Sequence, residues 1–498
     1  MSMNQKIYKV FSGVVFFVLL SKALGFVREA LIAARYGAGF ISDVYVLEDG
    51  LINTLYTIWA GVISTTFIPM SLSFKEKDRN RFSNNYLNIF LIIILFTTIL
   101  SLFFTREILY ILVPGFFEKY NLEQLNELIW ITRINLGSLL FVYLENFLIV
   151  VLQSKKFFIF SSIQGIILNC SLIIYLCFFY EYNALGIVLT NLIGHLLSFI
   201  SLFGFIKKKK IFKYNFYLDW KAPYLKNIIL LSAPVVILNV ISQFNYLVDR
   251  SMASLLNSGS MSLLNYANII SNLIYSVFGV SIASMAYTDL SIVQNNAEEF
   301  DNTFKKYIKI TIYILSPIVI TMIMERKEII NIIYNRGNLE YKDISVIANL
   351  LLLYIPSNCA MAIRDMYNRL LYIKKKTIVP SVISGISLIL NITLNVLLTR
   401  LIGVLGLALA TSISSVLATI FTIIYVRKKN YISRNNYIDR NIIVFSSVSI
   451  IFCFIINKVL FQDNTIIFIL KIIVTGMISL IIFNHKEISQ MIKERGRA

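Results

Sequence analysis

Charged side chains stand inside apolar segments of this sequence, where they could bind ions or polar substrates. They include, in chain order, Lys22, Arg28, Asp43, Glu48, Asp49, Asp249 and Arg250. Glu29 and Arg35 also lie at or near membrane depth, with no role assigned to them. Each charge costs roughly 2.5–3.5 kcal/mol at the centre of a bilayer, so these groups are expected to face water or a partner. Guanidinium and ammonium groups in such a place can hold an anion, and a guanidinium matches the oxygens of a phosphate.

The three cations are the candidates for binding a substrate pyrophosphate. Arg28 recurs as Arg250 after about 222 residues, which favours a shared function for the two. The acidic residues are expected to gate the site, to balance its charge when it is empty, or to bind a coupling cation; they are Asp43, Glu48, Asp49 and Asp249. Residues expected to line the same cavity are Gly25, Asn53, Tyr56, Asn265 and Asn268. The alternative is that the ions only pair with one another and lock helices together: Arg28 with Asp43 or Glu48, Arg133 with Glu145, and Arg364 with Asp365.

The sequence offers no enzyme site. It contains neither a G-x-x-x-x-G-K-[ST] loop nor an H-E-x-x-H pair, and its two histidines are His195, in an apolar segment, and His485. His195 is expected to be a hydrogen-bonded helix-packing group. The four cysteines lie in apolar segments without a C-x-x-C pair, so neither a metal nor any other cofactor is expected.

The composition places these residues in a polytopic membrane protein. Of 498 residues, 57% are hydrophobic and 15% are charged, which lies outside the range of soluble domains. The net charge of +19 comes from short Lys and Arg clusters between apolar runs, such as KKKK at 207–210. That pattern indicates cytoplasmic loops rather than nucleic-acid binding, and it puts both termini in the cytoplasm. The fold expected is all-α, with about fourteen transmembrane helices.

The sequence also repeats itself. SKKFFIFSSIQGIIL (154–168) aligns with IKKKTIVPSVISGIS (373–387) at an offset of about 220. Six helices intervene, so the copies share one orientation, as in transporters built from parallel repeats. The predicted parts are a lobe of helices 1–6 (residues 1–213), a lobe of helices 7–12 (214–430), and helices 13 and 14 with a basic tail (431–498). A substrate path is expected between the lobes.

Six segments resemble the MurJ family of lipid II flippases, within the multidrug, oligosaccharidyl-lipid and polysaccharide exporter superfamily. They are SKALGFVREALIAARYGAGFISDVYV (21–46), TTFIPMSLS (65–73), LNSGSMSLLNYANII (256–270), FGVSIASMAYTDLS (278–291), IIYNRGNLEYKDI (332–344) and LGLALATSIS (405–414). The resemblance implies fourteen helices and a cavity lined by the first, second, seventh and eighth, with cations that hold the lipid pyrophosphate.

The resemblance also assigns roles to particular positions. Lys22 stands where the family usually has Arg, Arg28 matches a second cavity Arg, and Asp43 matches an essential Asp. Two further cations of the family are absent: Tyr56 stands in place of an Arg in the second helix, and Ile269 in place of an Arg in the eighth. The Asp that precedes this second Arg in the family is Asn268 here. The implied cavity is less cationic than that of the family, which keeps other lipid-linked glycans open as cargo.

The leading hypothesis is therefore a flippase in the bacterial cytoplasmic membrane. It would move an undecaprenyl-pyrophosphate-linked saccharide, lipid II or a related glycan precursor, by alternating access. Membrane lipids, a coupling cation and glycan polymerases are the further partners considered, and nucleic acid is not one. One alternative is a drug or cation antiporter centred on Asp43, Glu48 and Asp49. The other is a non-transporting scaffold that recruits glycan synthases through its basic loops.

Overall fold

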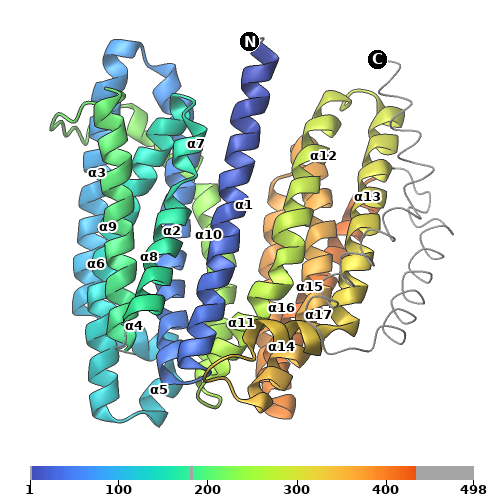
Figure 1. Cartoon of the computed structure of the whole chain (residues 1–498). Helices are drawn as coiled ribbons and strands as arrows, with labels where there is room; N and C mark the ends of the chain where they lie inside the picture. The colour runs from blue at the N-terminus through green and yellow to red at the C-terminus, as the bar shows by residue number, and fades with distance from the viewer. Residues whose placement is uncertain (1–2, 180–182, 433–498) are drawn as a thin grey trace. The chain divides into compact units, whose positions relative to one another are not determined.

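The computed structural model describes residues 3–179 and 183–432, and these residues form helices without any strand (Figure 1). Ten helices within the described part are long and apolar enough to cross a membrane. The all-α membrane fold expected from the sequence is confirmed, whereas the count of fourteen is not. The predicted helices 13 and 14 lie outside the described residues.

The chain divides into two compact units. The first contains residues 1–262 and 336–339, and the second contains 263–335 and 340–498. The helices of the first unit are α1 (Met3–Tyr36), α2 (Phe40–Ser73), α3 (Glu76–Phe103), α4 (Thr105–Leu112), α5 (Pro114–Lys119), α6 (Leu122–Ser154), α7 (Phe158–Ser161), α8 (Gln164–Phe178), α9 (Ala184–Lys208) and α10 (Tyr224–Ser254), and α11 (Ser260–Leu273) begins there. The second unit holds the rest of α11, a π-helical turn η1 (Ile274–Gly279), α12 (Val280–Ile292), α13 (Ala297–Met324), α14 (Arg326–Tyr334), α15 (Tyr341–Ile373), α16 (Ile378–Ile402) and α17 (Val404–Lys428).

Helix α10 packs with the first unit, although the repeat groups it with the helices that follow. The division by packing and the division by sequence repeat are thus different descriptions of the chain. The lobes ending at residue 213 and residue 430 remain a prediction.

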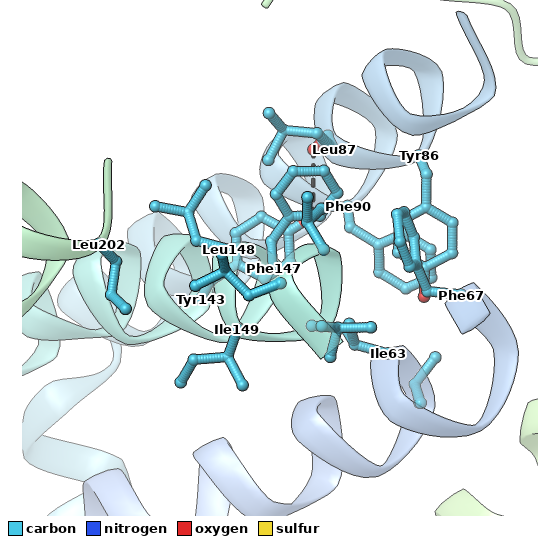
Figure 2. Packing of buried hydrophobic residues seen from close by; sticks show 14 of the residues in the cluster. Ile63, Phe67, Tyr86, Leu87, Phe90, Tyr143, Phe147, Leu148, Ile149 and Leu202 are labelled. Carbon is cyan, nitrogen blue, oxygen red and sulfur yellow. Dashed lines mark hydrogen bonds between the residues drawn. The ribbon is translucent and has the colours of Figure 1, made fainter. Parts of the chain in front are cut away.

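An aromatic core holds α2, α3 and α6 together in the first unit (Figure 2). The ring centroid of Phe67 on α2 lies 5.3 Å from that of Tyr86 on α3 and 5.4 Å from that of Phe147 on α6. Both ring pairs are edge-to-face. The buried Tyr86 hydroxyl shares a hydrogen bond of 2.9 Å with Thr66, so the ring's polar end is satisfied inside the core. This packing fixes the position of α2, which carries more of the predicted site residues than any other helix.

The C-terminus of α1 is capped by a segment from far along the chain. Gly37 follows α1 with φ of 62°, a left-handed conformation that glycine adopts easily. The backbone and side-chain amides of Asn338 then donate to the carbonyls of Ala34 (2.9 Å) and Arg35 (2.6 Å). A Cβ on Gly337 would lie 1.9 Å from the Ala34 carbonyl oxygen, so glycine is needed there for the close approach.

An asparagine ladder on α3, formed by Asn80, Asn84, Asn85 and Asn88, holds the extended chain after α9. Asn80 and Asn84 bond to the backbone of Lys213, Asn84 also to Asn215, Asn88 to Tyr217, and Asn85 to Asp219. Four helical residues rise about 6.0 Å and two extended residues about 6.6 Å, so the spacing of Asn80, Asn84 and Asn88 matches that of residues 213, 215 and 217. Asn85 lies outside this register and bonds to Asp219 where the chain turns back. The connection between α9 and α10 is therefore fixed to the first unit.

In the second unit, the π-helical turn η1 separates α11 from α12. A Cβ on Gly279 would lie 2.9 Å from Cβ of Ala362 on α15, so the glycine lets the two helices approach closely. Asn358 of α15 also donates to Ser271 of α11 at 3.0 Å. Such π-helical turns commonly mark functional sites in membrane helices.

Candidate functional site

The site is built on the facing surfaces of α1, α2 and α10 in the first unit. Arg28 of α1 forms an ion pair of 2.6 Å with Glu29, and the Tyr45 hydroxyl of α2 donates to the same Glu29 oxygen at 2.7 Å. Glu29 is 5% exposed and Arg28 is 18% exposed, so the ion pair is largely shielded from water. The Nε atom of Arg28 is buried and has no hydrogen-bond partner among the described residues.

Arg250 reaches the same region from α10. Its guanidinium is buried, lies 3.9 Å from the ring centroid of Tyr246, and donates to the Tyr246 hydroxyl and, at 3.4 Å, to the Leu47 carbonyl. The guanidinium occupies the space beside Gly50 of α2, where a Cβ would lie 1.3 Å from Nη1. Gly50 is thus the residue that allows Arg250 to lie against α2.

Both arginines belong to one electrostatic group. Each interacts with the same three side chains, Glu29, Tyr45 and Asp49. We call Arg28, Glu29, Tyr45, Asp49 and Arg250 the arginine cluster. Its two guanidinium groups and two carboxylates sum to a charge near zero, which lowers the cost of keeping four ions at membrane depth.

The remaining predicted residues of α1 and α2 lie around the cluster. Lys22 is exposed and lies about 9 Å before Arg28 along α1, as the helical rise dictates. Gly25 packs against Asn169 of α8, whose amide donates to the Ser21 carbonyl at 3.0 Å. Helix α1 continues through Gly25. Asn53 is exposed and donates to Asp49 at 2.8 Å, so it extends the cluster along α2.

Asp43 holds the beginning of α11. Its carboxylate accepts hydrogen bonds from the backbone N–H groups of Gly259 (2.7 Å) and Ser262 (2.8 Å) and from the Ser262 hydroxyl. Nearby, the Lys119 ammonium group donates to the Ser254 carbonyl at 2.6 Å. Burial lowers the pKa of Lys119, while the charge of Asp43 opposes that shift. In this structure Asp43 binds a helix end rather than Arg28.

Glu48 binds α6. It accepts hydrogen bonds from Thr132 (2.5 Å) and Asn135 (2.7 Å) and is 1% exposed. The alternative pairing of Arg28 with Asp43 or Glu48 is therefore wrong in this structure, where Arg28 pairs with Glu29 instead. The reason is that Glu29, adjacent to Arg28, lies within reach, while the two acids of α2 are satisfied by backbone, hydroxyl and amide donors.

The other predicted residues are distributed over both units. Tyr56 lines a cavity of about 200 Å³ in the first unit and interacts with Asn146. Asp249 is half-buried next to Arg250 on α10. Asn265 and Asn268 lie half-buried on the part of α11 that belongs to the second unit.

Sequence reasoning noted the charge of Glu29 without giving it a role, and it missed Tyr45, Tyr246 and Gly50. Glu29 and Tyr45 complete the arginine cluster, Tyr246 lies under Arg250, and Gly50 makes room for it. The isolated glycine directly after Asp49 in a helical segment was a usable signal, because such glycines mark close approaches. The two tyrosines gave no such signal, since aromatic residues are common throughout this sequence.

The comparisons with known proteins agree with one another. The family described as lipid II flippase MurJ matches residues 32–479. The chain is 26% identical over 410 residues to a probable lipid II flippase MurJ of Buchnera aphidicola, covering 80% of this chain and 79% of that protein. A probable lipid II flippase MurJ of Helicobacter pylori strain J99 is 28% identical over 414 residues, covering 78% and 88%.

The chain also resembles solved structures of membrane transporters. A lipid II flippase MurJ in an inward closed conformation matches with a TM-score of 0.79 at 25% identity, covering 95% of this chain and 99% of that one. An inward-facing multidrug transporter of the MOP superfamily matches with a TM-score of 0.70 at 11% identity, covering 82% and 94%, which shows a shared fold. This chain is a multi-pass membrane transporter that belongs to the lipid II flippase MurJ family.

Proposed function

We propose that this protein moves lipid II, or a closely related undecaprenyl-pyrophosphate-linked saccharide, across the bacterial cytoplasmic membrane for peptidoglycan synthesis. Its relatives carry the name of that substrate, and its sequence contains no nucleotide-binding loop. The two halves suggested by the sequence repeat would translocate the lipid by alternating access. The basic loops support an orientation with both termini in the cytoplasm.

The arginine cluster is the observation that carries this proposal. Two guanidinium groups from α1 and α10 share one buried electrostatic environment, and Arg28 keeps a buried Nε donor without a partner among the described residues. A pyrophosphate offers several anionic oxygens to such donors, and guanidinium groups bind them in a bidentate manner.

The carboxylates of the cluster give the site a way to release its ligand. In the absence of substrate, Glu29 satisfies Arg28, so the guanidinium is never a buried, uncompensated charge. An entering pyrophosphate competes with Glu29 for Arg28 and with the Leu47 carbonyl for Arg250. When the lipid leaves, the internal partners reform, which keeps binding reversible.

Lys22 would contact the substrate beyond the pyrophosphate. It is exposed and about 1.7 helical turns from Arg28 on a different flank of α1, so it would approach a second phosphate or a sugar substituent rather than the same oxygens. The family cations replaced by Tyr56 and Ile269 leave Lys22, Arg28 and Arg250 as the principal anion-binding groups. An ion gradient or the membrane potential would drive transport, since one charge crossing 100 mV is worth about 2.3 kcal/mol.

Replacing the two arginines tests the proposal. In cells depleted of their own lipid II flippase, we would express the wild type, Arg28→Gln and Arg250→Gln, and measure outer-leaflet lipid II with an externally added enzyme that cleaves it. Losing a charge-assisted hydrogen bond costs roughly 1.5–3 kcal/mol, so each variant is expected to lower transport by about 10- to 150-fold. Arg28→Lys and Arg250→Lys should retain part of the activity because they keep the charge.

The matched control is Arg106→Gln, which removes a cation from an exposed position of α4. It is expected to transport like the wild type. Wild-type outer-leaflet lipid II in the Arg28→Gln variant, at equal membrane expression, would contradict the proposed role of the cluster. Failure of the wild-type protein itself to restore outer-leaflet lipid II would contradict lipid II as the cargo.

A further inference from the structure

A second buried ionisable group lies in the first unit, apart from the arginine cluster. Glu145 of α6 is fully buried, and its Oε2 atom accepts a hydrogen bond of 2.6 Å from Gln164 at the start of α8. The same oxygen lies 3.0 Å from Nδ1 of His195 on α9. Its other oxygen, Oε1, is buried without a hydrogen-bond partner among the described residues. Three helices therefore meet at a single carboxyl group.

The chemistry of this pair requires a proton. If Glu145 were ionised beside a neutral His195, one uncompensated negative charge would be buried in helices that cross the membrane, and such a charge is strongly disfavoured. One added proton removes the net charge, whether it rests on the carboxyl or on the imidazole. Both arrangements of the proton leave the pair without net charge, so the proton belongs to the pair as a whole.

A polar path leads from the pair to a cavity. Tyr56 of α2 interacts electrostatically with Glu145 and also with Asn146, and both Tyr56 and Asn146 line the cavity of about 200 Å³. Thr97 and Ser101 of α3 add hydroxyl groups to its wall. The rest of the wall is largely apolar, so the polar connection between the pair and the cavity runs through Tyr56 and Asn146.

The other ionisable groups of the packed helices are directed elsewhere. Tyr86 of α3 bonds to Thr66, and Tyr143 of α6 donates to the Leu87 carbonyl at 3.1 Å. Helix α7 has the sequence FIFS and carries no titratable side chain, while the ionisable residues of α4 are exposed. From α2, α8 and α9, the groups that face Glu145 are Tyr56, the neutral amide of Gln164, and His195.

We infer that Glu145 and His195 form a proton-binding site inside the first unit, and that binding and release of this proton is coupled to translocation of the lipid. The coupling rests on the proposed function, whereas the site itself rests only on the geometry of α6, α8 and α9. Loss of the proton leaves a buried charge and therefore favours a conformation in which water reaches the pair. Proton occupancy would then bias the conformation of the helices on which Tyr56 and Glu145 lie.

Infrared difference spectroscopy of the purified full-length protein in lipid nanodiscs tests the site. Spectra at acidic and alkaline pH report the carboxylic C=O stretch of protonated carboxyl groups. The wild type is expected to show a pH-dependent band that is lost in Glu145→Gln and whose midpoint is shifted in His195→Gln. Glu123→Gln, which changes an exposed acid on the same helix, should leave the band intact. A wild-type spectrum with no component removed by Glu145→Gln would overturn the site.

Proteoliposomes containing lipid II test the coupling separately. The wild-type translocation rate should respond to an imposed pH gradient, and Glu145→Gln should lose that response while still binding lipid II. An unchanged response in Glu145→Gln, together with loss of its infrared band, would overturn the coupling and leave the site standing. Absence of lipid II translocation by the wild type would refute the proposed function and the coupling, and the infrared result would still decide the site.

Discussion

Replacing Gly50 by alanine tests the position of Arg250 without changing its charge. The new Cβ would lie 1.3 Å from Nη1 of Arg250, 2.2 Å from Cζ and 2.7 Å from Nη2. These are the last atoms of a flexible side chain, so the guanidinium can move while the helices stay in place. Alanine also favours an α-helix over glycine by roughly 0.5–1 kcal/mol, so α2 should fold at least as well.

The size of the effect follows from the displacement. An ordinary contact begins near 3.4 Å, so the guanidinium must retreat by roughly 2 Å from α2. At an effective dielectric of about 20, a phosphate charge interacts with a guanidinium by about 4 kcal/mol at 4 Å and about 2.8 kcal/mol at 6 Å. Losing about 1.4 kcal/mol corresponds to tenfold weaker binding.

The assay is equilibrium binding of purified lipid II to the protein in nanodiscs, compared among the wild type, Gly50→Ala and Arg250→Gln. Gly50→Ala is expected to bind about tenfold more weakly, with an unchanged or higher Tm. Gly204→Ala is the matched control, because a Cβ on this glycine of α9 meets nothing within 4 Å. It should bind lipid II like the wild type.

Two results would refute the reasoning. Wild-type affinity of Gly50→Ala alongside weak binding by Arg250→Gln would show that the charge matters but its place beside α2 does not. Wild-type affinity of both variants would remove Arg250 from the binding site.

Three further predictions concern the framework of the site. Glu48→Ala removes the carboxylate that accepts from Thr132 and Asn135, leaving them only the carbonyls of Leu128 and of residue 48, and is expected to lower stability by roughly 1–3 kcal/mol, measured as a fall in Tm. Asp43→Asn loses the charge-assisted bonds at the start of α11 and should accelerate hydrogen exchange of the amides at 259 and 262. Asn84→Ala removes a rung of the asparagine ladder and should speed tryptic cleavage after Lys213 by about fivefold per lost bond of about 1 kcal/mol.

Each of these has its own control. Glu48→Gln keeps an acceptor oxygen and should lose less stability than Glu48→Ala, and equal Tm values for all three proteins would argue against the link to α6. If amides 259 and 262 exchange as slowly in Asp43→Asn as in the wild type, the proposed role of the Asp43 carboxylate is contradicted. For the ladder, Asn121→Ala at the start of α6 is the comparison, and a cleavage rate equal to that of Asn84→Ala would contradict a local effect.

The sequence predicted the membrane fold because hydrophobic runs of helical length have few other uses. It also singled out Arg28 and Arg250, which the structure brings into one electrostatic cluster, because a charge in an apolar run is conspicuous in one dimension. Their partners were harder to predict. The sequence shows which acids are present, but not that Asp43 is directed at two backbone N–H groups or that Glu48 meets a threonine and an asparagine.

Packing details were also hidden. Gly50 makes room for Arg250, yet a glycine in a sequence does not say which side chain approaches it. The asparagine ladder joins two segments that are more than a hundred residues apart, one helical and one extended. It forms because four residues of the helix span about the same length as two residues of the extended chain. Such pairings depend on the three-dimensional path of the chain, which local patterns do not contain.

The cap on α1 has a consequence for how the protein is made. Asn338, which satisfies the last carbonyls of α1, follows Arg35 by 303 positions. A ribosome adds roughly 5–20 residues per second, so Asn338 is synthesised roughly 15–60 s after the carbonyls that it binds. During that interval water or another partner must satisfy them, because an unpaired buried carbonyl is costly. The first unit therefore reaches its final form only after residues 263–335 of the second unit have been synthesised.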